Sequence, residues 1–103
     1  MPLLNSAVEM QAEIAGWRHH IHENPEILFD CVKTSAFVAE KLRAFGCDEV
    51  ETGIGRTGVV GALRNGTSPR TIGLRADMDA LPILEANTFA HRSRHPGRMH
   101  ACG

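Results

Sequence analysis

Near the end of the sequence, His100 and Cys102 place an imidazole and a thiol two positions apart. Both groups are good ligands for zinc-like divalent ions, and the bound ion deprotonates the thiol. Two ligands do not complete a site, because structural zinc takes four and catalytic zinc takes three plus an open position. The alternative interpretation is an ordinary cysteine beside an exposed histidine. No other residue of the chain completes the ligand set convincingly.

Two carboxylates, Asp77 and Asp79, directly follow a predicted strand. Carboxylates at the carboxyl end of a strand in an open α/β sheet lie where ligands bind, and residues two apart point the same way in an extended chain. Such a pair can bind a metal, orient a ligand imidazole or set the pKa of a proton-transfer group. A solvated turn is the alternative.

The segment GIGRTG at 53–58 has the glycine spacing of dinucleotide-binding loops. That function requires a strand before the loop and a helix that opens at its end. The residues after Gly58 favour a strand, so we expect a tight turn between two strands. A small nucleotide-binding module using Gly53, Gly55 and Gly58 is the competing hypothesis, which a helix after Gly58 would support.

Histidine is unusually frequent and falls near the two ends of the chain: His19, His20, His22, His91, His95 and His100. On a helix, His19 and His22 are neighbours, whereas His20 points elsewhere. Histidines on a helix surface are mostly solvated, and this interpretation is favoured here. The basic segment 90–103 lacks interleaved aromatic residues for base stacking, so we expect no contact with nucleic acid.

The elements that position these residues begin with a helix that ends before Pro25. Ser6 and Glu9 fit a capping box at its start. Apolar residues follow at helical spacing: Met10, Ile14, Trp17 and Ile21. A second helix is predicted from Thr34 to Phe45, capped by Thr34 or Ser35 and terminated at Gly46.

The apolar pattern after the second helix changes to that of strands. Three strands are predicted at Cys47–Thr52, Thr57–Arg64 and Arg70–Ala76. Residues 82–103 read as a loop, with one helical turn around Ile83–Asn87. The pattern therefore predicts an α/β chain of two helices, about three strands and an irregular tail that carries the candidate ligands.

Composition narrows the class of protein. The chain has 103 residues, 43% of them hydrophobic and 22% charged, with a formal net charge of -1. These values are typical of one small globular domain and argue against a nucleic-acid module. No apolar run is long enough for a membrane span. An odd number of cysteines and a start without a secretory signal lead us to expect a cytoplasmic protein.

Four blocks, in order, resemble the hippurate hydrolase family of metal-dependent amidohydrolases, which includes N-acyl-amino-acid and indole-acetyl-amino-acid hydrolases. They are WRHHIHENPE at 17–26, TSAFV at 34–38 with GIGRTGVVG at 53–61, GLRADMDALP at 73–82 and MHACG at 99–103. The resemblance implies that 1–103 is the N-terminal fragment of a zinc-peptidase-like catalytic domain. The rest of that domain and an inserted dimerisation domain are absent.

The resemblance also implies residue roles. Cys102 matches a metal ligand, Asp79 a catalytic carboxylate beside the metals, and His100 lies next to the ligands or lines the substrate pocket. Asp77 stands where related peptidases carry a histidine ligand, which makes it a further candidate metal ligand. The complete enzyme would hold two divalent ions (Zn, Mn, Ni or Co), which polarise the amide carbonyl and activate a water.

The expected substrate of that complete enzyme is a small N-acyl amino acid such as hippurate, and the expected assembly is a homo-oligomer without nucleic-acid or membrane partners. The isolated fragment is expected to be inactive and to bind metal only weakly, because most of the ligands are missing. A third hypothesis is a non-catalytic interaction piece whose exposed sheet edges pair with other chains.

Overall fold

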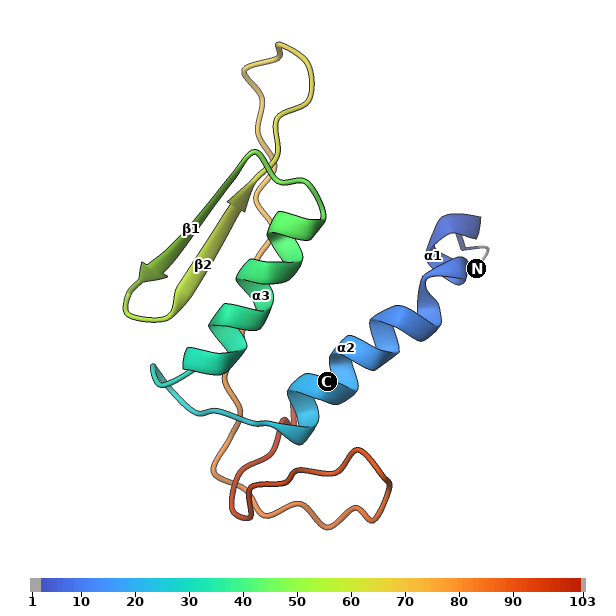
Figure 1. Cartoon of the computed structure of the whole chain (residues 1–103), viewed down its shortest axis with the longest axis vertical. Coiled ribbons are helices and arrows are strands. Elements are labelled where there is room, and N and C mark those ends of the chain that lie inside the picture. The colour runs from blue at the N-terminus through green and yellow to red at the C-terminus, as the bar shows by residue number, and fades with distance from the viewer. Residues whose placement is uncertain (1–2, 103) are drawn as a thin grey trace. The chain divides into compact units, whose positions relative to one another are not determined.

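The computed structural model describes residues 3–102, which form a mixed α/β chain. Its elements are α1 (Asn5–Glu9), α2 (Gln11–Glu23), α3 (Val32–Ala44), β1 (Glu49–Ile54) and β2 (Gly58–Ala62) (Figure 1). They divide into a terminal unit (residues 3–25 and 81–102) and a central unit (Glu26–Ala80). Within residues 3–102, no helix has the length and apolar character needed to cross a bilayer.

The single helix predicted before Pro25 is interrupted at Met10, which divides it into α1 and α2, and only the end of α2 agrees with the prediction. The helix α1 starts after Leu4 without a side-chain cap hydrogen bond, so the predicted capping box of Ser6 and Glu9 is wrong. Ser6 lies inside the first turn, beyond the position from which a side chain caps a helix. The helix α2 ends at Glu23, before Pro25, as expected. Its predicted apolar stripe is not buried, and Ile14 is 47% exposed.

The rest of the terminal unit is an irregular loop closed at its base. Leu81 and Met99 exchange backbone hydrogen bonds of 2.9 and 3.0 Å, which join the two ends of the loop. The predicted helical turn at Ile83–Asn87 is wrong, because Ile83 N–H bonds back to the Leu81 carbonyl at 2.8 Å and no helical ladder follows. The expectation of a loop over the rest of this segment is confirmed for 82–102.

In the central unit, α3 begins at Val32, two residues before the predicted start. Its first turn is capped by the Glu26 carboxylate and not by the predicted Thr34 or Ser35 side chains. The Oε2 atom of Glu26 accepts a hydrogen bond from Lys33 N at 3.1 Å, and Oε1 accepts one from Thr34 N at 2.6 Å. Two of the amide groups that a helix start leaves unpaired are thereby satisfied.

The strands β1 and β2 form an antiparallel hairpin in which Glu49 pairs with Ala62 and Glu51 with Val60. The helix α3 packs against this hairpin. Gly61 allows a close approach at this contact, since a Cβ there would lie 3.1 Å from Leu42 Cδ1 and 3.3 Å from Cys47 Sγ, tighter than an ordinary van der Waals contact. The two predicted strands of this region are confirmed, with bounds that differ by one or two residues.

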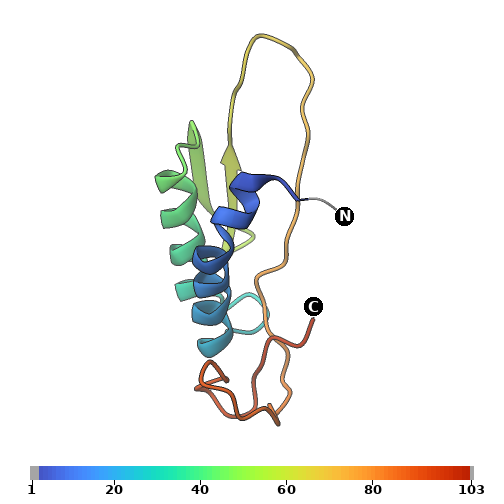
Figure 2. The same ribbon diagram turned by 90° about the vertical axis from the view of Figure 1, so that its right-hand side faces the viewer.

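The predicted third strand at Arg70–Ala76 is wrong, because this segment pairs with no strand in the described chain. Figure 2 shows it looping away from the hairpin before Ala80. Ile72 and Leu74 are 87% and 96% exposed there. The chain rejoins the unit where Ala80 N donates to the Glu26 carbonyl at 2.7 Å. A strand needs a neighbour for its backbone groups, and the described part of the unit offers this segment none.

Candidate functional site

The tail that carries His100 and Cys102 belongs to the terminal unit, and its position follows from the closed base of the loop. Cys102 comes three residues after Met99 and presents a free, exposed thiol. His100 is half-buried, with its ring centroid 6.4 Å from that of His22 on α2. An accessible thiol of this kind can serve as one ligand of a soft or borderline metal ion.

The two candidate carboxylates belong to the central unit. Asp77 Oδ1 accepts a hydrogen bond from Arg75 Nη2 at 2.7 Å, and both side chains of this ion pair are largely exposed. Asp79 is exposed as well, and Ala80 beside it is buried. An exposed ion pair contributes at most about 1 kcal/mol to stability, so the structural role of Asp77 is small.

The residues of this chain do not form a metal centre by themselves. Within the part of the chain that the structure describes, no three His, Cys, Asp or Glu side chains are arranged to hold an ion. The structure brings Asp77 and Asp79 into one unit, and His100 and Cys102 into the other. Their donor types suit a divalent ion, but the ligand set within residues 3–102 is incomplete.

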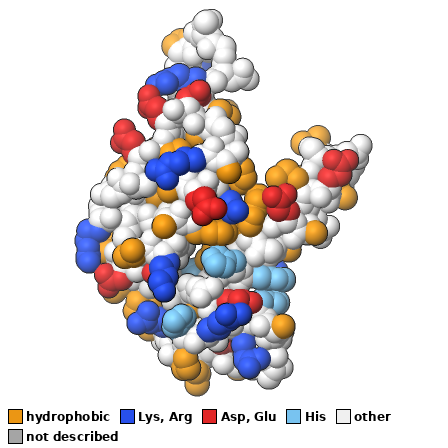
Figure 3. Space-filling model, viewed as in Figure 1, with side chains coloured by type: hydrophobic (Ala, Val, Ile, Leu, Met, Phe, Trp, Pro, Cys, Tyr) orange, Lys and Arg blue, Asp and Glu red, His pale blue; other side chains and the backbone are white. Residues whose placement is uncertain are grey.

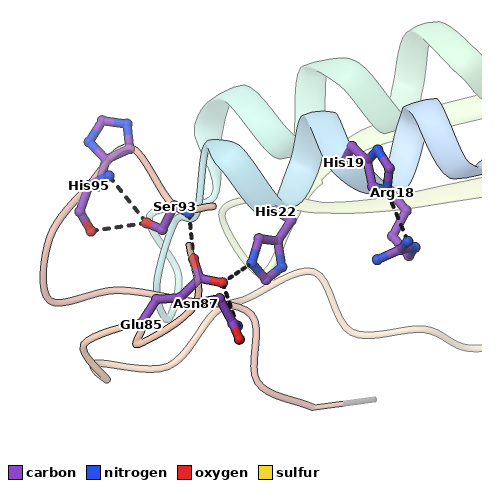
Figure 4. A network of polar contacts seen from close by, with 7 residues as sticks. All are labelled: Arg18, His19, His22, Glu85, Asn87, Ser93 and His95. Carbon is purple, nitrogen blue, oxygen red and sulfur yellow. Dashed lines mark hydrogen bonds and ion pairs between the residues drawn. The ribbon is translucent and has the colours of Figure 1, made fainter. Parts of the chain in front are cut away.

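The terminal unit contains a partly buried polar network that the sequence did not predict. Glu85 is 5% exposed at its side chain and lies against His22, which is 12% exposed (Figure 4). The Oε2 atom of Glu85 accepts hydrogen bonds from His22 Nε2 at 2.8 Å and from Asn87 Nδ2 at 2.9 Å. Its Oε1 atom accepts one from Ser93 N at 2.5 Å.

These contacts determine the ionisation of Glu85. Burial raises the pKa of this carboxyl, but the three hydrogen bonds from Ser93, Asn87 and His22 outweigh burial and lower the pKa to about 2. The carboxylate is therefore charged at neutral pH and can only accept, so His22 Nε2 must carry the proton between them. The expectation that the helix histidines are simply solvated is wrong for His22.

Another histidine contact in the terminal unit is a stack of three rings. His91 lies between His19 and Phe89, at centroid distances of 3.7 and 3.9 Å and with nearly parallel planes. Arg18 Nη2 lies 3.0 Å from His19 Nε2, an arrangement in which the guanidinium donates and the ring nitrogen accepts. Histidine side chains gather on the face shown in Figure 3. Burial and the neighbouring positive groups lower the pKa of His91.

One signal for this network was available in the sequence. Glu85 is the only acidic residue in 82–103, a segment with three histidines and three arginines. A lone carboxylate in a basic loop is a natural hydrogen-bond acceptor. Its partner His22 lies 63 residues away in the sequence, and no local pattern reports that pairing.

The glycine-rich segment forms the turn of the β-hairpin. Gly53 and Gly55 have φ angles of +76° and +56°, in the region that only glycine adopts without strain. The residues that follow Gly58 form the strand β2 and not a helix. The nucleotide-binding hypothesis is therefore not supported, because no helix N-terminus meets the loop.

Comparison with known proteins relates the chain to a group of hydrolases, although no family model matches it. It is 50% identical over 103 residues to "Hippurate hydrolase" of Campylobacter jejuni, covering 27% of that protein. It is 44% identical over 95 residues, 92% of the chain, to the "N-acyl-L-amino acid amidohydrolase" of Geobacillus stearothermophilus, of which it covers 25%. An IAA-amino acid hydrolase of Arabidopsis thaliana matches 87% of the chain at 44% identity, with 20% of that protein covered.

The chain thus spans about a quarter of the length of the curated relatives it matches. The resemblance inferred from the four sequence blocks is confirmed by these matches, which extend over nearly all of the chain. All three relatives are named as hydrolases: of hippurate, of N-acyl-L-amino acids and of IAA-amino acids. The chain is a homologue of a segment of the hippurate hydrolase, N-acyl-amino-acid amidohydrolase and IAA-amino acid hydrolase proteins.

Proposed function

We propose that this chain is part of a metal-dependent hydrolase that cleaves the amide bond of N-acyl amino acids such as hippurate. The observation that carries the proposal is the 50% identity over 103 residues to hippurate hydrolase. Because the chain spans about a quarter of that relative, the reaction is assigned to the whole protein. The chain contributes part of the catalytic domain, and the remaining ligands and the dimerisation domain come from other parts of the protein.

Within this function, Cys102 is the thiolate ligand and Asp79 the catalytic carboxylate. Asp77 is a further ligand, and His100 lies beside the ligands or lines the substrate pocket. The exposed, free thiol of Cys102 supports its role, because a buried thiol would be unable to reach an ion held by other parts of the protein. The donor types fit zinc, manganese, nickel or cobalt.

The exposed segment at 70–76 supports the assignment to a larger domain. Ile72 and Leu74 are two residues apart, so an extended chain places them on the same face, and both are almost fully exposed. We propose that these exposed apolar side chains are covered by the rest of the protein. Sedimentation of the isolated chain should show concentration-dependent association, and Leu74→Lys should reduce it. A monomer at all concentrations would contradict this assignment.

The function is tested with a hybrid enzyme. Residues 1–103 replace the aligned segment of the Campylobacter hippurate hydrolase, and benzoate or glycine release from hippurate is measured. We expect an active hybrid in which Cys102→Ala lowers kcat/KM by at least about 100-fold, the upper end of the loss seen when groups that only support metal ligands are removed. The matched control Cys47→Ala, at a half-buried cysteine between α3 and β1, should stay within a few-fold of the hybrid.

An inactive hybrid that folds and dimerises like its parent would contradict the proposed function. An active hybrid in which Cys102→Ala behaves like Cys47→Ala would contradict the role of Cys102. The isolated chain 1–103, assayed with added zinc or manganese, should show no hippurate hydrolysis. Clear turnover by the pure chain would show that a complete site exists within it.

A further inference from the structure

The contacts of Glu85 link the loop 81–99 to α2. One carboxylate oxygen holds the loop's own backbone at Ser93, and the other holds His22 in the last turn of the helix. A second link lies beside it, where Arg94 N donates to the Glu23 carbonyl at 2.9 Å and Arg94 Nη2 lies 3.0 Å from Glu23 Oε2. The loop therefore has a fixed position relative to the end of α2.

The tail with the candidate ligand departs from this fixed loop. The reciprocal bonds between Leu81 and Met99 close the loop at its base, and Cys102 follows three residues later. One path from His22 to Cys102 thus runs through the Glu85 carboxylate and the Leu81–Met99 backbone bridge, beside the link between Arg94 and Glu23. Neither His22 nor Glu85 has a direct role in the proposed chemistry.

We propose that Glu85 and His22 form a clamp that positions Cys102, with Glu85 as the positioning residue of the thiolate ligand. The inference rests on the proposed function only for the metal-binding role of Cys102. The geometric claim, that the clamp restricts where the thiol lies relative to α2, concerns this chain alone. The charged state of Glu85 suits the role, because a carboxylate accepts all three hydrogen bonds at once and a neutral amide does not.

The geometric claim is measured by energy transfer from Trp17, the only tryptophan of the chain and a residue of α2, to a dansyl group on Cys102. Cys47→Ser removes the half-buried thiol, and Cys31 is buried and stays unlabelled. Time-resolved decay gives the distribution of Trp17–Cys102 distances. We expect Glu85→Gln to broaden that distribution while the far-ultraviolet circular dichroism of the helices is unchanged.

Two further variants complete the test. Glu49→Gln removes an exposed ion pair with Arg64 in the central unit and should leave the distribution unchanged. Asn87→Ala removes one of the three donors to Glu85 from an exposed position and should broaden the distribution partially. If Glu85→Gln unfolds the chain, Asn87→Ala shows whether the clamp restricts the Trp17–Cys102 distance. A folded Glu85→Gln or Asn87→Ala chain with the parental distribution would overturn the clamp.

The effect of the clamp on metal binding through Cys102 is measured in the hybrid hydrolase. We expect Glu85→Gln to weaken zinc affinity by about 10- to 100-fold, the usual loss when a group that orients a metal ligand is removed, and to lower kcat more than it changes KM. Glu49→Gln should change neither quantity. Unchanged zinc affinity in an active Glu85→Gln hybrid would overturn the positioning role. An inactive parental hybrid would contradict the proposed function, and the energy-transfer result would still test the clamp.

Discussion

Each of the two units of this molecule is organised by one carboxylate that accepts three hydrogen bonds. In the central unit, Glu26 receives Thr34 N, Thr34 Oγ1 and Lys33 N, all within eight residues of itself. In the terminal unit, Glu85 receives donors from its own loop and from His22, 63 residues away. The same chemical group thus starts a helix in one unit and joins two distant segments in the other.

The difference predicts different consequences when each carboxylate is lost. Glu26 satisfies the first amides of α3, so its removal weakens one local element. Glu85 joins the loop to α2 beside the Arg94–Glu23 link, so its removal loosens the attachment of a whole loop. Thiol labelling and substitution of the two carboxylates test that contrast.

Thiol reactivity should separate the two units most clearly. Cys31 is 2% exposed, and its pKa is raised by burial and by the charges of Glu26, Asp79 and Asp30. Cys102 is exposed. Since the thiolate is the reactive form, a disulfide reagent should modify Cys102 first and Cys31 only when the central unit opens. Peptide mapping after short exposure measures this order, and equal rates at both residues would contradict the buried environment of Cys31.

Removal of the Glu26 carboxylate should destabilise α3. We expect Glu26→Ala to lower the free energy of unfolding by about 1–2 kcal/mol, the usual cost of losing a helix cap. Urea unfolding followed by circular dichroism measures the change. The control Glu40→Ala, at an exposed position of the same helix, should stay within about 0.5 kcal/mol of the parent. Equal effects of the two variants would show that Glu26 is not a cap.

Acid should weaken the terminal unit through Glu85. Its pKa is about 2 in the folded chain against an ordinary value of 4.5, so its contribution is complete above pH 4.5 and is lost as the pH falls toward 2. The pKa of Glu26 is lowered as well, so part of the acid loss belongs to the central unit. Thermal unfolding between pH 5 and pH 2 should show a shallower pH dependence for Glu85→Gln than for the parent. The same pH dependence of thermal unfolding in the parent and in Glu85→Gln would mean that Glu85 is not held as a charged acceptor.

The exposed ion pair of Asp77 should matter least for folding. Asp77→Asn is expected to change the free energy of unfolding by less than about 0.5 kcal/mol, because an exposed pair with Arg75 gains little in water. The same substitution in the hybrid hydrolase should lower activity if Asp77 is a metal ligand. A large loss of stability instead would assign Asp77 a structural role.

The sequence predicted the elements whose signals are local. Pro25 ends α2, the glycine turn at 53–58 precedes a strand, and a residue in the left-handed region, Gly46, follows α3. Each of these follows from the backbone preference of one residue. The predicted cap of α3 failed because Glu26, eight residues before Thr34, competes with the nearer side chains for the same amides.

The features that the sequence did not predict depend on contacts between residues that are distant in the chain. The strand expected at Arg70–Ala76 has the right alternation, but pairing requires a neighbour that its own residues do not specify. The buried pair of His22 and Glu85 depends on how the loop folds back to α2. The roles of Cys102, Asp77 and Asp79 came from the resemblance of sequence blocks, and they stay predictions.

The role of Cys102 as a thiolate ligand is tested most directly in the hybrid hydrolase loaded with cobalt(II). Cobalt bound to a thiolate absorbs in the near ultraviolet through charge transfer from sulfur to the metal. We predict this band in the hybrid and in its Cys47→Ser variant, and its loss in Cys102→Ser. A band of full intensity in the Cys102→Ser hybrid would contradict the account.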